Sequence, residues 1–192
     1  MSKGRLEAFS DGVIAIIITI MVLELKVPHG TDAAALRPLA PLFASYVLSF
    51  VMVGIYWNNH HHLFQAVDRV NGRILWTNLH LLFWLSQIPF VTAWMGENHF
   101  APLPVALDGF ILLMAGVAYY FLVRAILAHH GRDSRVARAL GRDFKGKISV
   151  LLYMVALPVA FSNRWVAVGI YTLVALIWFV PDRRIEGRVG KE

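Results

Sequence analysis

The sequence contains no cysteine, and only 16% of its 192 residues are charged, whereas 58% are hydrophobic. The absence of cysteine excludes a disulfide framework, thiol catalysis and cysteine-ligated metal or iron–sulfur sites. The shortage of charge argues against a soluble domain, for which about 25% charged and roughly 45–50% apolar residues are usual. A mean hydropathy of +0.59 points the same way. The composition therefore predicts a membrane protein.

Six stretches of the sequence are apolar, with charges only near their ends. A helix needs about 20 mostly apolar residues to cross a hydrocarbon core of about 30 Å. The predicted spans cover 9–27, 42–64, 74–95, 105–127, 148–161 and 165–180. The last two are short and are expected to form a tight helical hairpin. The sequence thus predicts an all-α membrane protein of six transmembrane helices in a single domain, 1–192.

The positive charges are distributed unevenly between the two sides of these spans. Fifteen Lys and Arg residues lie at the two termini and in the second-to-third and fourth-to-fifth connections. The opposite connections contain only Lys26, Arg37 and Arg164. Because cytoplasmic loops carry the excess of Lys and Arg, both termini are predicted to be cytoplasmic. The net charge of +6 is then explained by topology, and no nucleic-acid partner is expected.

The longest polar segment of the chain is the fourth-to-fifth connection. Arg135, Arg138 and Arg142 have helical spacing within it. We expect this loop to be solvated and to contact anionic lipid head groups.

Polar residues at the start of the first span carry a functional signal. Ser10 or Asp11 suits the N-cap of a helix, where an acid is stabilised by the helix dipole. Asp11 also lies where the chain enters hydrocarbon, and an acid there needs a cationic or hydrogen-bonding partner. Arg5 is the nearest candidate in the sequence.

Further along the first span, Ile16, Thr19 or Ile20, and Leu23 recur at the spacing of one helix face. Thr19 is the only hydroxyl in this stretch. A threonine in a membrane helix commonly bonds a carbonyl of its own backbone, so the residues alone leave its role open.

Several of these residues belong to motifs of a known family. The string Arg5-x-x-x-Phe9-Ser10-Asp11 precedes an aliphatic helix that ends in Leu-Glu-Leu-Lys-Val-Pro. Later spans contain Trp57…His60-His61-x-Leu63-Phe64, Trp76-x-Asn78 and Pro89-Phe90. Over essentially its whole length the chain resembles the lysosomal potassium channel family known as transmembrane protein 175. Animal members carry two six-span repeats, so a chain with one repeat resembles a bacterial homologue of the plasma (inner) membrane.

The resemblance implies a potassium-preferring cation channel, assembled as a homotetramer, whose pore is lined by the first span of each subunit. Ile16 would form the narrowest point, and Ile20 and Leu23 would also face the pore. Thr19 is then a polar pore-lining or selectivity candidate. The expected partners are transiently bound potassium ions and membrane lipid, with no cofactor and no resident metal.

The resemblance also implies a buried polar network near the cytoplasmic mouth of the pore. Arg5, Ser10 and Asp11 of the first span would join Asn78 and His80 of the third span. One histidine of the run 60–62 would complete it. Phe9 and Trp76 belong to the same motifs.

A channel of this kind needs a different filter from the carbonyl rings of potassium channels that contain a Thr-Val-Gly-Tyr-Gly loop, since the sequence has no such loop. A fourfold ring of Ile16 offers a dry constriction that gates by dewetting and discriminates modestly in favour of potassium. Acids predicted on the extracellular side would concentrate cations there. These acids are Glu24, Asp32, Glu97 and Asp108, and Lys26 is expected to neutralise Glu24.

Three other classes of function compete with a channel. A membrane enzyme could use the eight histidines for a metal site, but His60, His61 and His62 are consecutive and do not share a helix face, so we predict no enzyme. A secondary transporter of a cation or small solute would show helices broken at mid-membrane. A structural scaffold would conduct nothing. Flux measurements distinguish all three from a channel.

Overall fold

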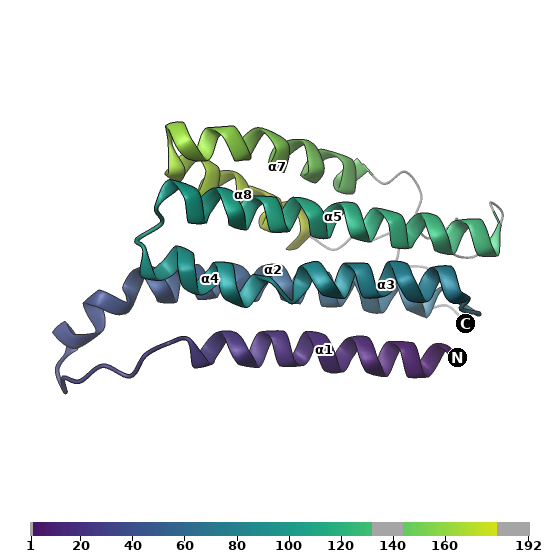
Figure 1. Ribbon diagram of the computed structural model, residues 1–192, viewed down its shortest axis with the longest axis horizontal. Coiled ribbons are helices and arrows are strands. Elements are labelled where there is room, and N and C mark those ends of the chain that lie inside the picture. The colour runs from purple at the N-terminus through teal and green to yellow at the C-terminus, as the bar shows by residue number, and fades with distance from the viewer. Residues whose placement is uncertain (1, 132–143, 180–192) are drawn as a thin grey trace.

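The fold is entirely helical over the residues that the structure, a computed structural model, describes, which are 2–131 and 144–179 (Figure 1). Consecutive membrane-length segments run in alternating directions along the long axis (Figure 1). The helices are α1 (Lys3–Leu23), η1 (Ala33–Leu39), α2 (Ala40–Gln65), α3 (Gly72–Leu85), α4 (Ile88–Glu97), α5 (Pro102–His130), α7 (Phe144–Ser162) and α8 (Arg164–Phe179). The prediction of an all-α protein with several membrane-length apolar helices is confirmed.

Among the described residues, five helical segments are long and apolar enough to cross a membrane, and each overlaps one of the first five predicted spans. The sixth, α8, is apolar but has only 16 residues, which is about 24 Å of helix. The first helix begins at Lys3 and ends at Leu23, so its C-terminal end lies four residues before the predicted one. Residue 180 and the arginines at 135, 138 and 142 lie outside the described residues.

The third predicted span differs from expectation because it is divided into two helices. α3 ends at Leu85 and α4 begins at Ile88. Pro89 explains the break, since its ring has no N–H and clashes with the carbonyl four residues earlier. Two backbone groups at the break are bonded locally, because the Ser86 N–H donates to the Leu82 carbonyl and the Gln87 N–H to the Trp84 carbonyl. Pro158, in contrast, lies inside the continuous helix α7.

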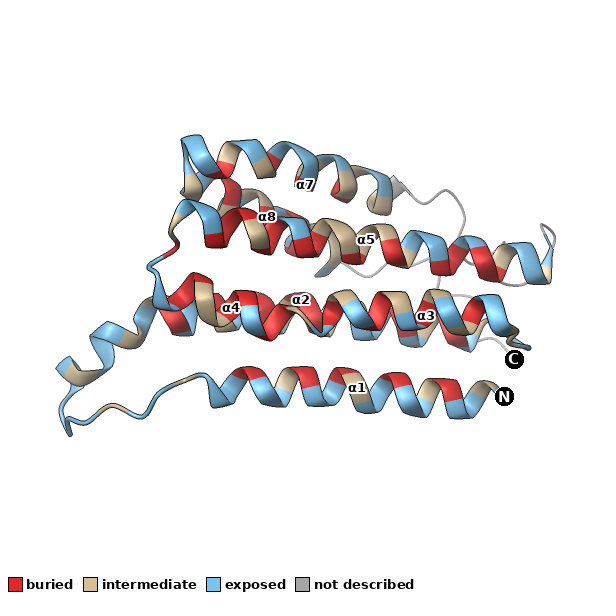
Figure 2. Ribbon diagram, in the orientation of Figure 1, coloured by how far each residue is buried: buried red, intermediate tan, exposed pale blue. Residues whose placement is uncertain are grey.

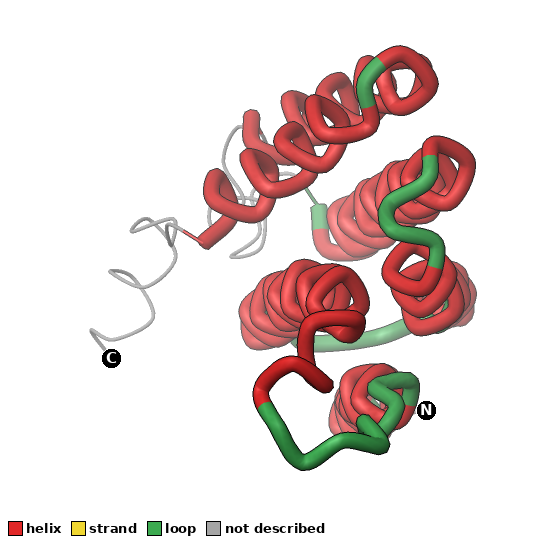
Figure 3. Tube along the Cα trace, turned by 90° about the vertical axis from the view of Figure 1, so that its left-hand side faces the viewer, coloured by secondary structure: helices red, strands yellow, loops and turns green. Residues whose placement is uncertain are grey.

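The first helix lies at the edge of the bundle. It packs against α2, α3 and α4, and the hairpin of α7 and α8 lies on the other side of α5 (Figures 1 and 3). Only one side of α1 is buried, and its other sides are exposed along its length (Figure 2). An apolar helix that is exposed in this way needs lipid or another protein surface to cover it.

A glycine allows α8 to approach α5 closely. The Tyr171 hydroxyl donates to the Val105 carbonyl at 3.0 Å, and Tyr171 is fully buried. A Cβ at Gly109 would overlap this hydroxyl group. The glycine is therefore required for the hairpin of α7 and α8 to dock on α5.

We expect Gly109→Ala to destabilise the protein by about 1–3 kcal/mol, because the added methyl group must displace the Tyr171 ring. Thermal unfolding of the purified protein measures this. Gly169→Ala in α8 is the matched control, since a Cβ there meets nothing within 4 Å. Equal melting temperatures for the two variants would show that Tyr171 does not require the glycine.

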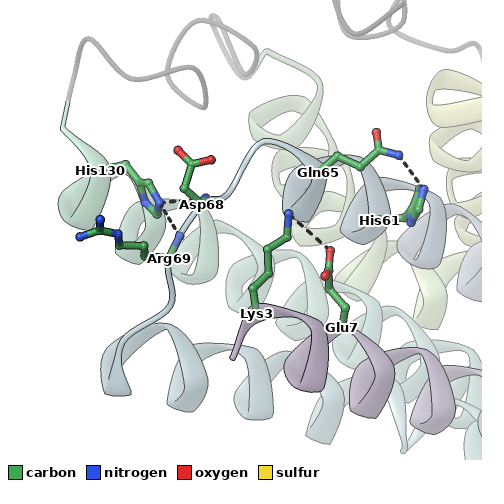
Figure 4. Close-up of polar contacts among 7 residues, drawn as sticks. All are labelled: Lys3, Glu7, His61, Gln65, Asp68, Arg69 and His130. Carbon is green, nitrogen blue, oxygen red and sulfur yellow. Dashed lines mark hydrogen bonds and ion pairs between the residues drawn. The ribbon is translucent and has the colours of Figure 1, made fainter. Parts of the chain in front are cut away.

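Side-chain contacts join the loop after α2 to the end of α5, at the end of the bundle where α1 begins (Figure 4). His130 Nδ1 donates to the Ile126 carbonyl at 3.0 Å, so Nε2 is the acceptor for the backbone N–H groups of Asp68 and Arg69. Nearby, Lys3 pairs with Glu7 at 3.9 Å along α1. These contacts fix the α2–α3 connection, and hence the start of α3, against α5.

Candidate pore-lining face and polar chain

The buried side of α1 anchors the helix to the rest of the bundle. Its buried residues recur three or four positions apart and face α2, α3 and α4. They are Leu6, Ser10, Ile14, Ile17 and Met21. Because a helix turns about 100° per residue, this spacing fixes which residues lie on the remaining sides.

The residues expected to line a pore lie together on an exposed side of α1. Ile16 is 57% exposed, Ile20 is 41% exposed and Leu23 is 79% exposed, although all three are aliphatic. Phe9 shares this side and is 49% exposed. The Thr19 hydroxyl is also exposed, and it donates to the Ile16 carbonyl at 3.0 Å. The helix therefore presents an outward aliphatic stripe that the rest of the described chain does not cover.

A third side of α1 carries small exposed residues. Gly4, Ala8 and Ala15 lie on it together with Asp11 and the larger Val22, at intervals that keep them on one side of a helix, and all five are exposed. Small residues let membrane helices approach closely. This side is suited to contact with another helix rather than with bulky lipid chains.

A chain of hydrogen bonds (the polar chain) links α1, α2 and α3 through His60, Asn78 and Ser10. His60 Nε2 donates to Asn78 Oδ1 at 2.8 Å, Asn78 Nδ2 donates to Ser10 Oγ at 2.8 Å, and Ser10 Oγ donates to the Leu6 carbonyl at 2.8 Å. The amide orientation fixes the proton of His60 on Nε2. His60 is 1% exposed, and Asn78 and Ser10 are fully buried. Of the three consecutive histidines, His60 is therefore the one that lies in the chain.

Asp11 and Arg5 lie outside the polar chain. Asp11 is exposed, and its Oδ1 accepts a hydrogen bond from Trp57 Nε1 at 3.1 Å. Arg5 is exposed and has no ion pair among the described residues. Residues six positions apart on a helix point to different sides, so Arg5 cannot readily reach Asp11. Trp57 rather than Arg5 supplies the partner that Asp11 needs.

His80 and Trp76 also lie outside the polar chain. His80 Nε2 accepts from Trp84 Nε1 at 3.0 Å, and its ring stacks against Phe121. Trp76 is 75% exposed. Both residues are two positions from Asn78, which places them roughly 200° away around α3. The motif spacing could not bring all three to one side.

A second group of buried hydroxyls, which the sequence analysis did not identify, joins α2 to α4. Thr92 Oγ1 donates to the Ile88 carbonyl and lies 2.7 Å from Ser49 Oγ, while Ser45 Oγ lies 3.0 Å from the Thr92 carbonyl. Gly96 allows this approach, because a Cβ there would lie 2.5 Å from Ser45 Oγ. Ser45 and Ser49 are four residues apart, and this spacing was the only sequence signal for the contact.

The acidic residues predicted on the extracellular side are arranged differently from expectation. Asp108 is only 2% exposed, because its side of α5 faces the interior of the subunit. Lys26 pairs with Glu97 rather than with Glu24, and this contact raises the pKa of Lys26. Glu24 and Asp32 are exposed, and the Asp32 carboxylate caps η1. No group of three or more potential metal ligands occurs within residues 2–131 and 144–179.

We expect Asn78→Ala to lower the stability of the protein by about 1–3 kcal/mol, because it leaves the His60 N–H without an acceptor and removes the donor to Ser10. Thermal unfolding and size-exclusion chromatography measure the effect. Asn59→Ala is the matched control, since the amide of Asn59 donates to Ile55 in its own helix. If the Asn78 variant has the same melting temperature as the control, the polar chain does not hold α1 in place.

Comparison with known proteins places this arrangement in a family. Residues 5–89, which include all three members of the polar chain, match the model of the endosomal/lysosomal potassium channel TMEM175. A potassium channel of Chryseobacterium sp. (strain P1-3) is 56% identical over 186 residues, covering 97% of each chain. This chain belongs to the TMEM175 family. It is accordingly a multi-pass membrane protein.

Two further relatives extend the similarity over more than nine-tenths of the chain. A potassium channel of Streptomyces collinus is 33% identical and covers 92% of this chain and 91% of its own length. The crystal structure of a lysosomal potassium-selective channel TMEM175 homologue from Chamaesiphon minutus matches with a TM-score of 0.81 at 29% identity. That match covers 95% of this chain and 97% of the other, so the similarity in fold includes the α7–α8 hairpin.

Proposed function

We propose that this protein is one subunit of a potassium-preferring cation channel in a bacterial inner membrane, with both termini in the cytoplasm. Four copies of α1 line its central pore, and it is not an enzyme. The observation that carries the proposal is the outward aliphatic stripe of Ile16, Ile20 and Leu23 on a helix at the edge of the bundle. The TMEM175 relatives described as potassium channels support the choice of ion.

The three sides of α1 support cyclic assembly. One side packs on its own subunit, the side with Gly4, Ala8 and Ala15 is suited to a neighbouring α1, and the aliphatic stripe is left for the axis. A single helix can line a central pore only if rotational symmetry supplies its copies. Four copies of Ile16 would then meet as the narrowest ring.

The polar chain and the Asp11–Trp57 contact would hold each α1 at a fixed rotation. Both join α1 to α2 near the end where α1 begins, and the polar chain adds α3. Polar contacts between membrane helices stabilise one arrangement over its alternatives. We infer that they keep Ile16 directed at the axis.

The proposed constriction selects by the cost of dehydration. Ile16, Ile20 and Leu23 extend over about 10 Å of helix, so an ion crossing this stretch loses contact with bulk water. Potassium releases its hydration water more readily than sodium does, and the Thr19 hydroxyls can partly replace it. Since no carbonyl cage is present in this stretch of helix, the preference for potassium should be modest.

The divided third span is the one observation that favours a secondary transporter, because transporters often bind substrate at broken helices. Here the break is accounted for by Pro89, which lies in the first turn of α4 and cannot donate to the carbonyl of Leu85. A channel and a transporter differ in how flux depends on substrate concentration and on coupling to a second solute. A transporter would give saturable, coupled uptake.

Reconstitution into liposomes tests the proposed function. Under a potassium gradient, we expect passive potassium flux that follows the electrochemical gradient, with a smaller sodium flux under matched conditions. Protein-free liposomes and liposomes with heat-denatured protein are the controls. Absence of passive cation flux from correctly folded protein would refute the channel.

A further inference from the structure

A cavity separate from α1 lies inside the subunit, between α2, α5, α7 and α8. Its volume is about 370 Å³, which lies within the usual range of ligand pockets. Gly116 helps to create the cavity, because it has no side chain to occupy this space. A Cβ at this position would fit without overlap, at ordinary contact distance from Val150 and Tyr56. The residues that line the cavity belong to neither the aliphatic stripe nor the polar chain.

The interior of the cavity is apolar. Met52, Tyr153 and Val174 line its deeper part and are each 2–3% exposed. From Lys147 to Tyr153 along α7 the cavity extends over about 9 Å of helix. Apolar walls of this length are suited to a hydrocarbon chain, whereas water would find few polar partners there.

The mouth of the cavity is polar, aromatic and positively charged. Lys147 lines it, is exposed and has no ion pair among the described residues. Two further cations lie over aromatic rings of the mouth. Arg124 lies 6.0 Å from the centre of the Tyr120 ring, and Lys145 lies 6.0 Å from the centre of the Trp178 ring. No acidic residue of the described part of the chain lines the cavity. The charge at the mouth therefore favours an anionic group.

We propose that this cavity binds one acyl chain of an anionic phospholipid, with the lipid phosphate paired to Lys147. Lys147 lies in the first turn of α7, at the end of the bundle that we infer faces the cytoplasm, so the lipid comes from the cytoplasmic leaflet. Basic pockets between membrane helices on this side bind the head groups of anionic lipids. The lipid wedges the α7–α8 hairpin against α2 and α5.

The test uses the full-length protein in nanodiscs that contain phosphatidylglycerol with a photoreactive diazirine in one acyl chain. After illumination, mass spectrometry locates the labelled peptides. We expect labelling of 116–120 and 149–153, and competition by unlabelled phosphatidylglycerol. Diazirine-labelled phosphatidylcholine should label these peptides about five-fold less, because its choline cation cancels the net negative charge that Lys147 attracts, a difference of about 1 kcal/mol.

Two variants with matched controls sharpen the test. Lys147→Gln should lower labelling by phosphatidylglycerol about five-fold, whereas Arg164→Gln, at the opposite end of the bundle, should leave it unchanged. Gly116→Leu should abolish labelling by filling the cavity, whereas Gly169→Leu, which projects into open space, should not. Size-exclusion profiles confirm that each variant is folded.

Three outcomes would overturn the proposal. Labelling confined to the outer surface of the wild-type protein would mean that no acyl chain enters the cavity. Equal labelling by phosphatidylcholine, with no effect of Lys147→Gln, would show that the cavity does not require an anionic head group. Full labelling of folded Gly116→Leu would place the lipid elsewhere. The wild-type map is decisive even if a variant fails to fold, and none of these results depends on ion flux.

Discussion

Ile16→Asn should reduce the preference of the reconstituted channel for potassium, so that the ratio of potassium to sodium permeability falls to about 1. In the proposed assembly, four Ile16 side chains form the narrowest ring, and an ion must lose water to pass them. Four asparagine amides would hydrate the ring and offer oxygen ligands to either ion. Sodium flux should therefore rise more than potassium flux. Bi-ionic flux or current measurements on purified protein give the ratio.

Leu151→Asn is the matched control for this substitution. Leu151 is 55% exposed, close to the value for Ile16, but it lies on α7, on the far side of α5 from α1. It should retain the wild-type ratio. If Ile16→Asn also retains that ratio while conducting normally, Ile16 is not the selective constriction.

Ile20→Lys should abolish cation flux. Ile20 lies about one helical turn from Ile16, so four lysines at this level would surround the proposed path. At about 6 Å and an effective dielectric constant of about 20, one lysine repels a potassium ion by about 3 kcal/mol, which alone lowers the flux about a hundred-fold. Potassium efflux from liposomes measures the loss.

The control for Ile20→Lys is Leu151→Lys, because both place an ammonium group on an exposed part of a membrane helix. Leu151 lies in the second turn of α7, so its lysine can extend to the interface, and flux should be unaffected. Normal potassium efflux from the folded Ile20 variant would be incompatible with α1 surrounding the pore.

The sequence was sufficient to predict the membrane-length apolar segments and the stripe of Ile16, Ile20 and Leu23 on the first one. Runs of apolar residues identify membrane helices because a helix satisfies its own backbone hydrogen bonds, whatever its tertiary contacts. Ile16, Ile20 and Leu23 could be assigned to one side because helical periodicity fixes their relative directions. The predicted span ends four residues too late because Leu25 and Val27 continue the apolar composition past Glu24, whereas the helix itself ends at Leu23.

The partners of polar residues were harder to predict. His80 and Asn78 are close in sequence but point to different sides of α3, and only the rotation of α3 in the bundle decides which one meets Ser10. Trp57 becomes the partner of Asp11 because of how α2 packs on α1. The break at Ser86 and Gln87 was foreseeable from Pro89, whereas the buried position of Asp108 depends on the docking of α7 and α8.

The absence of cysteine makes one measurement on α1 especially direct. Single cysteines are introduced in turn at Ile14, Ile16, Ile17, Ile20, Met21 and Leu23, and flux is recorded before and after a water-soluble cationic thiol reagent. If four copies of α1 surround the pore, the reagent blocks the variants at 16, 20 and 23 and leaves those at 14, 17 and 21 conducting. Block at the second set, or at neither set in conducting variants, would contradict a pore lined by the outward stripe of α1.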